Sequence, residues 1–67
     1  MAPMTLATVL RTLREEQDIT QEQLAKRARI ARTYVTLLES GRKKNPSLDI
    51  LKRLARALDV PVGELLE

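Results

Sequence analysis

The chain has 67 residues and a formal net charge of +3; 43% of its residues are hydrophobic and 31% are charged. This length allows one domain with a small core, so we expect a single domain over residues 1–67. Because the chain contains no cysteine and no histidine, disulfides, thiolate metal sites and histidine-based catalysis are excluded. We therefore expect a protein that is not an enzyme and that holds no metal and no cofactor. With one Tyr and no Phe or Trp, stacking of single-stranded bases on an aromatic platform is disfavoured.

Membrane insertion and secretion are disfavoured as well. Runs of consecutive apolar residues are two or three residues long, which is too short for a transmembrane span. The first five residues lack the basic segment and apolar stretch of a secretory signal. We expect a cytoplasmic protein without a membrane partner.

The charge is distributed unevenly along the chain. Residues 26–44 carry seven basic residues and one acidic residue, a net charge of +6, and residues 45–56 carry three and one, a net charge of +2. Residues 1–25 carry two basic and four acidic residues, and residues 57–67 carry three acidic residues. A basic block between acidic ends suggests one positive surface that faces a polyanion. The alternative is that these charges only solvate helix exteriors.

Hydrophobic spacing predicts five short helices and no strand. The first helix covers residues 5–17, where apolar residues recur at steps of three and four: Leu6, Val9, Leu10 and Leu13. The second covers residues 20–29 and begins with a capping box, in which the Thr20 hydroxyl accepts from the Gln23 amide and Gln23 reaches back.

Capping and breaking residues bound the other three helices. These cover residues 32–40, 48–58 and 62–66. Gly41 follows the third helix, where a left-handed cap is favoured, and Ser47 is a good N-cap for the fourth. The inward face of the fourth helix is expected to hold Leu48, Leu51, Leu54, Ala55 and Leu58.

The second and third helices carry the functional information. Two short helices joined at Arg29-Ile30-Ala31 have the form of a helix-turn-helix over about residues 20–40. A short helix can enter the major groove of DNA only if a neighbouring helix holds it so that it projects from the domain surface. The side chains on its outward face must then be polar or small. That face of the third helix carries Arg32, Thr33, Thr36 and Leu37. The pattern alone is moderately specific, because helical hairpins are common in bundles.

Three segments resemble the lambdoid-repressor-like, or Xre-type, helix-turn-helix family: Thr20-Gln21-Glu22-Gln23-Leu24-Ala25, Arg32-Thr33-Tyr34-Val35 and Leu38-Glu39-Ser40-Gly41. Restriction–modification controller proteins are especially similar, since they often begin the recognition helix with Arg-Thr-Tyr. The resemblance covers about residues 6–66. It implies an all-α, compact five-helix lambda-repressor-like DNA-binding domain, with its helix-turn-helix at the second and third helices.

The resemblance also implies roles for single residues. Gln21 matches a position that contacts a phosphate and buttresses the recognition helix. Arg14 and Glu39 match an ion pair between the first and third helices, which as a partly exposed pair contributes under about 1 kcal/mol. The positions that match base-edge contacts are Arg32, Thr33 and Thr36. The loop of Arg42, Lys43, Lys44 and Asn45 matches a segment beside the DNA backbone.

Side-chain chemistry agrees with these roles. Arg32 can donate twice to a guanine, which is worth about 1–3 kcal/mol of discrimination, and Thr33 and Thr36 can hydrogen-bond to a base or touch a thymine methyl. Leu37 could also touch a thymine methyl. The amides beside Thr20, at the start of the second helix, favour a phosphate.

Plainer alternatives stay open for these residues. Arg32 could bind only phosphate, and Thr33 could only cap or solvate the first turn. Tyr34 could contact a phosphate or pack against a neighbouring helix. Leu37 could lie at the edge of the core, and Lys43 and Lys44 could be solvated loop residues.

Two positions depart from the family pattern. Arg29 stands in the turn where the family usually has Gly, and a left-handed conformation there costs on the order of 1 kcal/mol. The geometry of the turn and the tilt of the third helix are therefore left open. Ala31 stands where the family often has a Ser or Thr N-cap. Because alanine cannot accept the capping hydrogen bond, about 1 kcal/mol of helix stability is forgone. A phosphate or a water could replace that cap.

Domains of this kind usually bind DNA as twofold dimers, because one small helix reads too few base pairs. The candidate dimer residues are Val60, Val62, Leu65 and Leu66, since the last helix is too short to bury them all. The alternative is that Leu65 and Leu66 complete the core.

The leading hypothesis is a sequence-specific transcriptional regulator, such as a repressor, that binds double-stranded DNA as a homodimer on a (pseudo)palindromic operator. No small-molecule effector is expected, so occupancy of the operator must itself block or recruit polymerase. The alternative is a protein-interaction module, such as an antitoxin, in which DNA binding is secondary. Salt separates the two hypotheses, because phosphate contacts weaken steeply with salt and an apolar protein interface does not.

Overall fold

The computed structural model describes residues 5–66; residues 1–4 and Glu67, which the expected domain of residues 1–67 includes, lie outside the described part. The described chain forms four α-helices and a short 3-10 helix: α1 Leu6–Glu16, α2 Gln21–Ala28, α3 Arg32–Glu39, α4 Leu48–Leu58 and η1 Val62–Glu64. Residues 5–66 contain no β-strand, so the expected all-α class is confirmed.

The prediction of a fifth α-helix is wrong. The segment after Pro61 forms only a three-residue 3-10 helix, Val62–Glu64, closed by amides that bond three residues back. Gly63 lies inside this segment, and glycine disfavours a longer helix by about 1 kcal/mol relative to alanine. The helix also has no side-chain hydrogen bond at its N-cap, and it leads directly to Leu65, which turns into the core.

Side-chain hydroxyls begin three of the helices. Thr5, Thr20 and Ser47 each accept a hydrogen bond from the amide three residues later. At α2 the Gln23 amide donates to the Thr20 hydroxyl at 3.0 Å, and the Gln23 side chain accepts from the Thr20 amide at 2.8 Å. The predicted capping box is therefore confirmed, and it fixes where α2 begins.

Left-handed residues end all four helices. They are Asp18, Arg29, Gly41 and Asp59, with φ between 56° and 82°. The next residue is apolar after three of the helices, and its amide bonds back to a helix carbonyl: Ile19 to Arg14, Ile30 to Ala25, and Val60 to Ala55. This repeated termination satisfies the last carbonyls and turns an apolar side chain toward the core.

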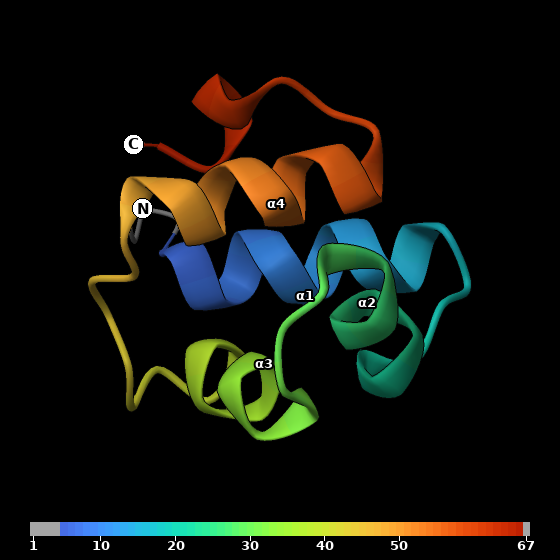
Figure 1. The fold of residues 1–67 in the computed structure, drawn as a ribbon, viewed down its shortest axis with the longest axis horizontal. Coiled ribbons are helices and arrows are strands. Elements are labelled where there is room, and N and C mark those ends of the chain that lie inside the picture. Colours follow the sequence, from blue (N-terminus) through green and yellow to red (C-terminus); the bar gives the residue numbers. More distant parts are fainter. Residues whose placement is uncertain (1–4, 67) are drawn as a thin grey trace.

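The helices enclose one core. In the view of Figure 1, α1 lies between α4 and the pair α2 and α3, and η1 lies beyond α4. α2 packs on α3 and α4, α3 packs on α1, and η1 packs on α4. The most deeply buried side chains come from all four α-helices: Leu10, Leu24, Val35, Leu38, Leu54 and Leu58. None of the helices described here is long and apolar enough to cross a membrane.

Candidate functional site

The outward face of α3 is polar. Arg32, Thr33 and Thr36 are exposed, and Leu37 is partly buried at the edge of this face. The opposite face is apolar, because Val35 and Leu38 are completely buried or nearly so. The structure therefore brings the four predicted base-edge residues together on one side of a short helix.

Ser40 extends this face, and the sequence patterns did not predict it as a site residue. It is exposed and lies four residues after Thr36 and seven after Thr33, the spacing that places side chains on one helix face. Its hydroxyl donates to the Leu37 carbonyl at 3.0 Å and accepts from the Arg42 amide. The same spacing rule applied one residue further would have found it.

A buried ion pair anchors α3 to α1. Arg14 donates to both carboxylate oxygens of Glu39, from Nε to Oε2 at 2.8 Å and from Nη2 to Oε1 at 3.0 Å. A further donation, from Nη1 to the carbonyl of Ile19 at 2.9 Å, holds the chain after α1. The hydrogen bond that Arg14 donates to Glu39 raises the pKa of Arg14 above its ordinary value, against the lowering effect of burial.

The pair was predicted correctly, and it is part-buried, because Arg14 keeps intermediate exposure while Glu39 is buried. The side chains of Arg14 and Glu39 are only 13% and 3% exposed. A bidentate pair that is shielded from water leaves a costly charge behind if one partner is removed.

Gln21 extends this network to α2. Its Nε2 donates to Oε1 of Glu39 at 3.1 Å, and its Oε1 accepts from the Thr36 hydroxyl at 2.9 Å. The Thr36 hydroxyl also lies 3.2 Å from the carbonyl of Arg32. The buttressing role implied for Gln21 thus has a geometric basis: one amide joins α2 to two positions on α3. The hydrogen of the Thr36 hydroxyl is donated inside the protein, so Thr36 can offer its methyl group and its oxygen lone pairs outward.

The turn between α2 and α3 takes the left-handed geometry in spite of its arginine. Arg29 has φ 59° and ψ 45°, and its amide bonds to carbonyls in the last turn of α2. The open question about this turn is therefore answered: Arg29 adopts the conformation that a glycine would adopt freely, at a cost on the order of 1 kcal/mol. Ala31 is the N-cap of α3 and makes no side-chain cap hydrogen bond.

A concave notch lies where α2 and α3 begin. It has a volume of about 380 Å³ and is lined by Arg14, Ile19, Thr20, Gln21, Glu22 and Arg32. The structure thus places Thr20 and Gln21, predicted near a phosphate, beside Arg32. The helix dipole and the arginines favour an anion here, and Glu22 opposes it.

The basic loop after α3 is exposed and tied to that helix. The amides of Arg42 and Lys43 both donate to the carbonyl of Leu37 at 3.1 Å. The ammonium of Lys43 lies 5.2 Å from the centre of the Tyr34 ring, within the range of a cation–π contact. Tyr34 is half-buried and packs against the core, while Lys44 and Asn45 are exposed. The predicted backbone-contacting residues therefore flank the C-terminal end of α3.

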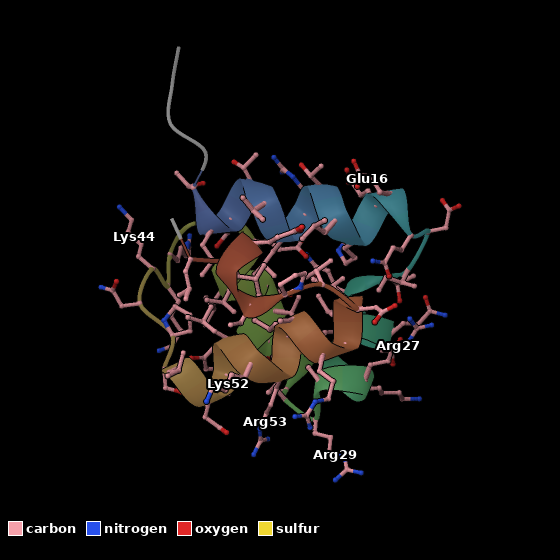
Figure 2. The ribbon with its side chains drawn as sticks, turned by 90° about the horizontal axis from the view of Figure 1, so that it is seen from above. Glu16, Arg27, Arg29, Lys44, Lys52 and Arg53 are labelled. Atoms are coloured by element: carbon pink, nitrogen blue, oxygen red, sulfur yellow. The ribbon has the colours of Figure 1, made fainter. Side chains whose placement is uncertain are left out.

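The basic residues do not form the one surface expected from the sequence. Arg27 and Arg29 line a groove with Lys52, Arg53 and Arg56 of α4, and no residue of the basic loop lines it. Figure 2 shows Lys44 at one end of the molecule and Arg27 toward the other. Arg27 and Lys44 belong to one basic stretch of the sequence, but they lie toward different ends of the molecule.

The four candidate dimer residues differ in exposure. Leu65 is 4% exposed and belongs to the core, whereas Leu66 is 48% exposed. Val60 and Val62 are partly buried against the core. A groove of about 310 Å³ runs beside Leu66, lined by Leu6, Lys44, Asn45, Pro46, Leu51, Leu65 and Leu66.

Leu48 was wrongly placed on the inward face of α4. It is 53% exposed, while Leu51, Leu54, Ala55 and Leu58 are buried as predicted. Leu48 is the first residue of α4, and the loop before it is exposed, so it is left uncovered at the edge of the core.

Comparison with known proteins gives consistent matches. The Helix-turn-helix family profile matches residues 10–65. The immunity repressor protein of Bacillus phage phi105 is 36% identical over 63 residues, which are 94% of this chain and 43% of the relative. The restriction-modification controller protein C.AhdI from Aeromonas hydrophila superposes with a TM-score of 0.86 and 38% identity, and the match covers 91% of each chain. SinR, the master regulator for biofilm formation solved in complex with DNA, gives a TM-score of 0.90 and 28% identity over 94% of this chain and 100% of that one.

The fold and the surface of α3 define a small α-helical domain that presents a short polar helix on a buried ionic anchor. The chain belongs to the helix-turn-helix family, as its sequence predicted. The predicted similarity to restriction–modification controller proteins is confirmed. The chain spans about half the length of the curated relatives it matches.

Proposed function

We propose that this chain is a regulator of transcription that binds duplex DNA by placing α3 in the major groove. The observation that carries the proposal is the outward face of α3, with Arg32, Thr33 and Thr36 exposed together over a buried anchor. In this proposal α2, the turn at Arg29 and α3 are the helix-turn-helix, over about residues 20–40. The relatives, an immunity repressor among them, support the same class of function.

The proposed contacts divide into two kinds. Arg32, Thr33, Thr36 and Leu37 reach base edges. Thr20, Gln21, Tyr34, Arg42, Lys43, Lys44 and Asn45 hold the phosphate backbone on either side. The notch at the start of α2 supports the first phosphate site, and the loop bound to the Leu37 carbonyl supports the second. This division assigns specificity to α3 and salt-dependent affinity to its flanks.

A homodimer on a twofold-symmetric operator is part of the proposal. Leu66 and Leu48 are the two large hydrophobic side chains exposed within residues 5–66, and the groove beside Leu66 adds Leu6 and Pro46. An isologous contact through such a surface would set two copies of α3 on one face of the duplex. Sedimentation at tens of micromolar, an order of magnitude suited to small interfaces, is expected to show a dimer, and monomer alone would contradict this part.

The proposal is tested by selecting bound duplexes from a random library. We expect one enriched motif, arranged as an inverted repeat whose half-sites lie about one helical turn apart. Arg32→Ala should lose or shift the preference at the contacted base. Recovery of random sequences by the wild-type chain would contradict the base-reading role of α3.

A further inference from the structure

A second cationic surface lies outside the proposed recognition face. A groove of about 540 Å³ is lined by Arg27, Ala28, Arg29, Asp49, Lys52, Arg53 and Arg56, and we call it the basic groove. Five of its seven lining residues are cations, and they come from two stretches of chain, at the end of α2 and along α4. Figure 2 shows Arg27, Arg29, Lys52 and Arg53 on the same side of the molecule, with Glu16 on the opposite edge.

Arg53 holds the two walls of the basic groove together. Its Nη1 donates to the carbonyl of Arg29 at 3.2 Å, which ties α4 to the turn after α2. Its Nε lies 3.0 Å from Oδ2 of Asp49, so the carboxylate that lines the groove is already matched by a cation of the same helix. Arg27, Lys52 and Arg56 add their charges on top of this pair. The two walls of the basic groove are therefore tied together, and the groove carries an excess of positive charge.

Arg29 distinguishes the basic groove from a surface whose charged side chains only interact with solvent. A left-handed backbone is strained for arginine and unstrained for glycine, yet the chain has an arginine at φ 59° and directs it to the basic groove. Backbone strain that persists at one site points to a role for the side chain it carries. Within residues 5–66 the other two non-glycine residues with positive φ, Asp18 and Asp59, are of a type that tolerates this conformation.

The basic groove is separate from the α3 surface. No residue of α3 or of the loop 42–46 lines it. In the view of Figure 1, α4 and α3 lie at opposite edges of the helices, and the α4 residues of the groove are not part of the outward face of α3. The residues that line the groove are therefore distinct from those proposed to hold the first duplex.

The lining of the basic groove selects the kind of occupant. Ala28 is its one apolar residue, so it lacks the aromatic or aliphatic anchors of a protein interface. It also lacks an aromatic ring on which single-stranded bases could stack. Four of its five cations are arginines, whose guanidinium forks suit phosphate oxygens. We infer that the basic groove binds the phosphate backbone of a second segment of duplex DNA while α3 holds the first, an inference that rests on the proposed function.

The test is bridging of two duplexes by the purified chain. Two short duplexes of one sequence, one labelled with a donor dye and one with an acceptor dye, are mixed with the protein, and energy transfer between them is measured. Arg27→Ala with Lys52→Ala is expected to lower the transfer at least fivefold, while affinity for one labelled duplex stays within about twofold. The matched control, Arg11→Ala with Lys26→Ala, removes the same charge from exposed positions outside the groove and should keep wild-type transfer.

A second variant separates loss of the site from damage to the fold. Arg29→Gly removes a groove cation and relieves the left-handed strain, so it should lower transfer while it raises the melting temperature. Wild-type transfer in both groove variants would overturn the inference, because two α3 helices of a dimer would then be doing the bridging.

Three further outcomes show which of the two proposals has failed. If the wild-type chain binds single duplexes but never bridges them, the inference is overturned and the proposed function stands; if it binds no duplex at all, both fail. Binding of a labelled oligoglutamate peptide that is lost in the groove variants, without any transfer between duplexes, would assign the groove to an acidic protein and overturn the inference.

Discussion

Both carboxylate oxygens of Glu39 are held by the guanidinium of Arg14, at 2.8 and 3.0 Å, although the two residues lie 25 positions apart in the sequence. The pair joins the last turn of α1 to the last turn of α3, and Gln21 adds the first turn of α2. Three helices therefore meet at one ionic joint. The direction in which α3 presents its outer face depends on this joint.

Removing the charge of Glu39 should destabilise the fold. In Glu39→Gln the amide keeps the size of the side chain, but Arg14 is left without its counter-ion at a position only 13% exposed. We expect the free energy of unfolding to fall by about 2–3 kcal/mol, measured by urea denaturation followed by circular dichroism. In a domain of this size such a loss is a large share of the total stability.

Glu15→Gln is the matched control for that change. Its carboxylate lies 4.0 Å from the same guanidinium, but the Glu15 side chain is 64% exposed. The free energy of unfolding should change by less than about 0.5 kcal/mol. Equal effects of the two substitutions would mean that the Arg14–Glu39 pair is not the joint described above.

Arg32→Ala should reduce discrimination between DNA sequences. Loss of a bidentate base contact is expected to weaken binding to the selected duplex by about 1–3 kcal/mol, which is about 5- to 150-fold, and to affect unrelated duplexes less. Fluorescence anisotropy with both duplexes measures the difference. Arg11→Ala, at an exposed position of α1, is the control for the lost charge. An unchanged ratio of the two affinities in Arg32→Ala would reduce Arg32 to a phosphate contact.

The loop lysines should act on all duplexes alike. Lys43→Ala with Lys44→Ala removes two proposed phosphate contacts, so the slope of log affinity against log salt should become shallower by about two units. The ratio of affinities for selected and unrelated duplexes should stay the same. A change of sequence preference without a change of slope would contradict the assignment of this loop to the backbone.

Arg29→Gly should stabilise the fold. The turn keeps its left-handed geometry, which glycine adopts without strain, and the gain is partly offset by the greater freedom of glycine in the unfolded chain. We expect the free energy of unfolding to rise by about 0.5–1 kcal/mol, and the melting temperature to rise by several degrees. Calorimetry measures both. A lower melting temperature would show that the Arg29 side chain contributes more to stability than its backbone strain removes.

The helix limits were predictable because local chemistry decides them. Thr20 and Gln23 form the capping box at the expected place, and Gly41 takes the expected left-handed cap. The Arg14–Glu39 pair was found through resemblance rather than through spacing. A contact between residues 25 positions apart depends on how helices pack, which periodicity along one helix does not reveal.

The sequence did not reveal the features that depend on packing at the ends of helices or on the path of the chain. The 3-10 segment replaced a helix because Leu65 is drawn into the core and Gly63 weakens the last turn. Leu48 follows the apolar period of α4, but no element covers the start of that helix. The basic groove joins residues 27–29 to residues 49–56, so charge counted in consecutive blocks could not show it.

The most direct test of the account is the binding of labelled duplex DNA by the purified chain at several salt concentrations. If α3 and its flanks hold the backbone through four or more phosphates, log affinity should fall with log salt at a slope of about −4 or steeper, and the affinity should drop at least a hundredfold between about 50 and 200 mM. The account is contradicted if the chain binds no duplex at the lower concentration, or if its affinity is indifferent to salt.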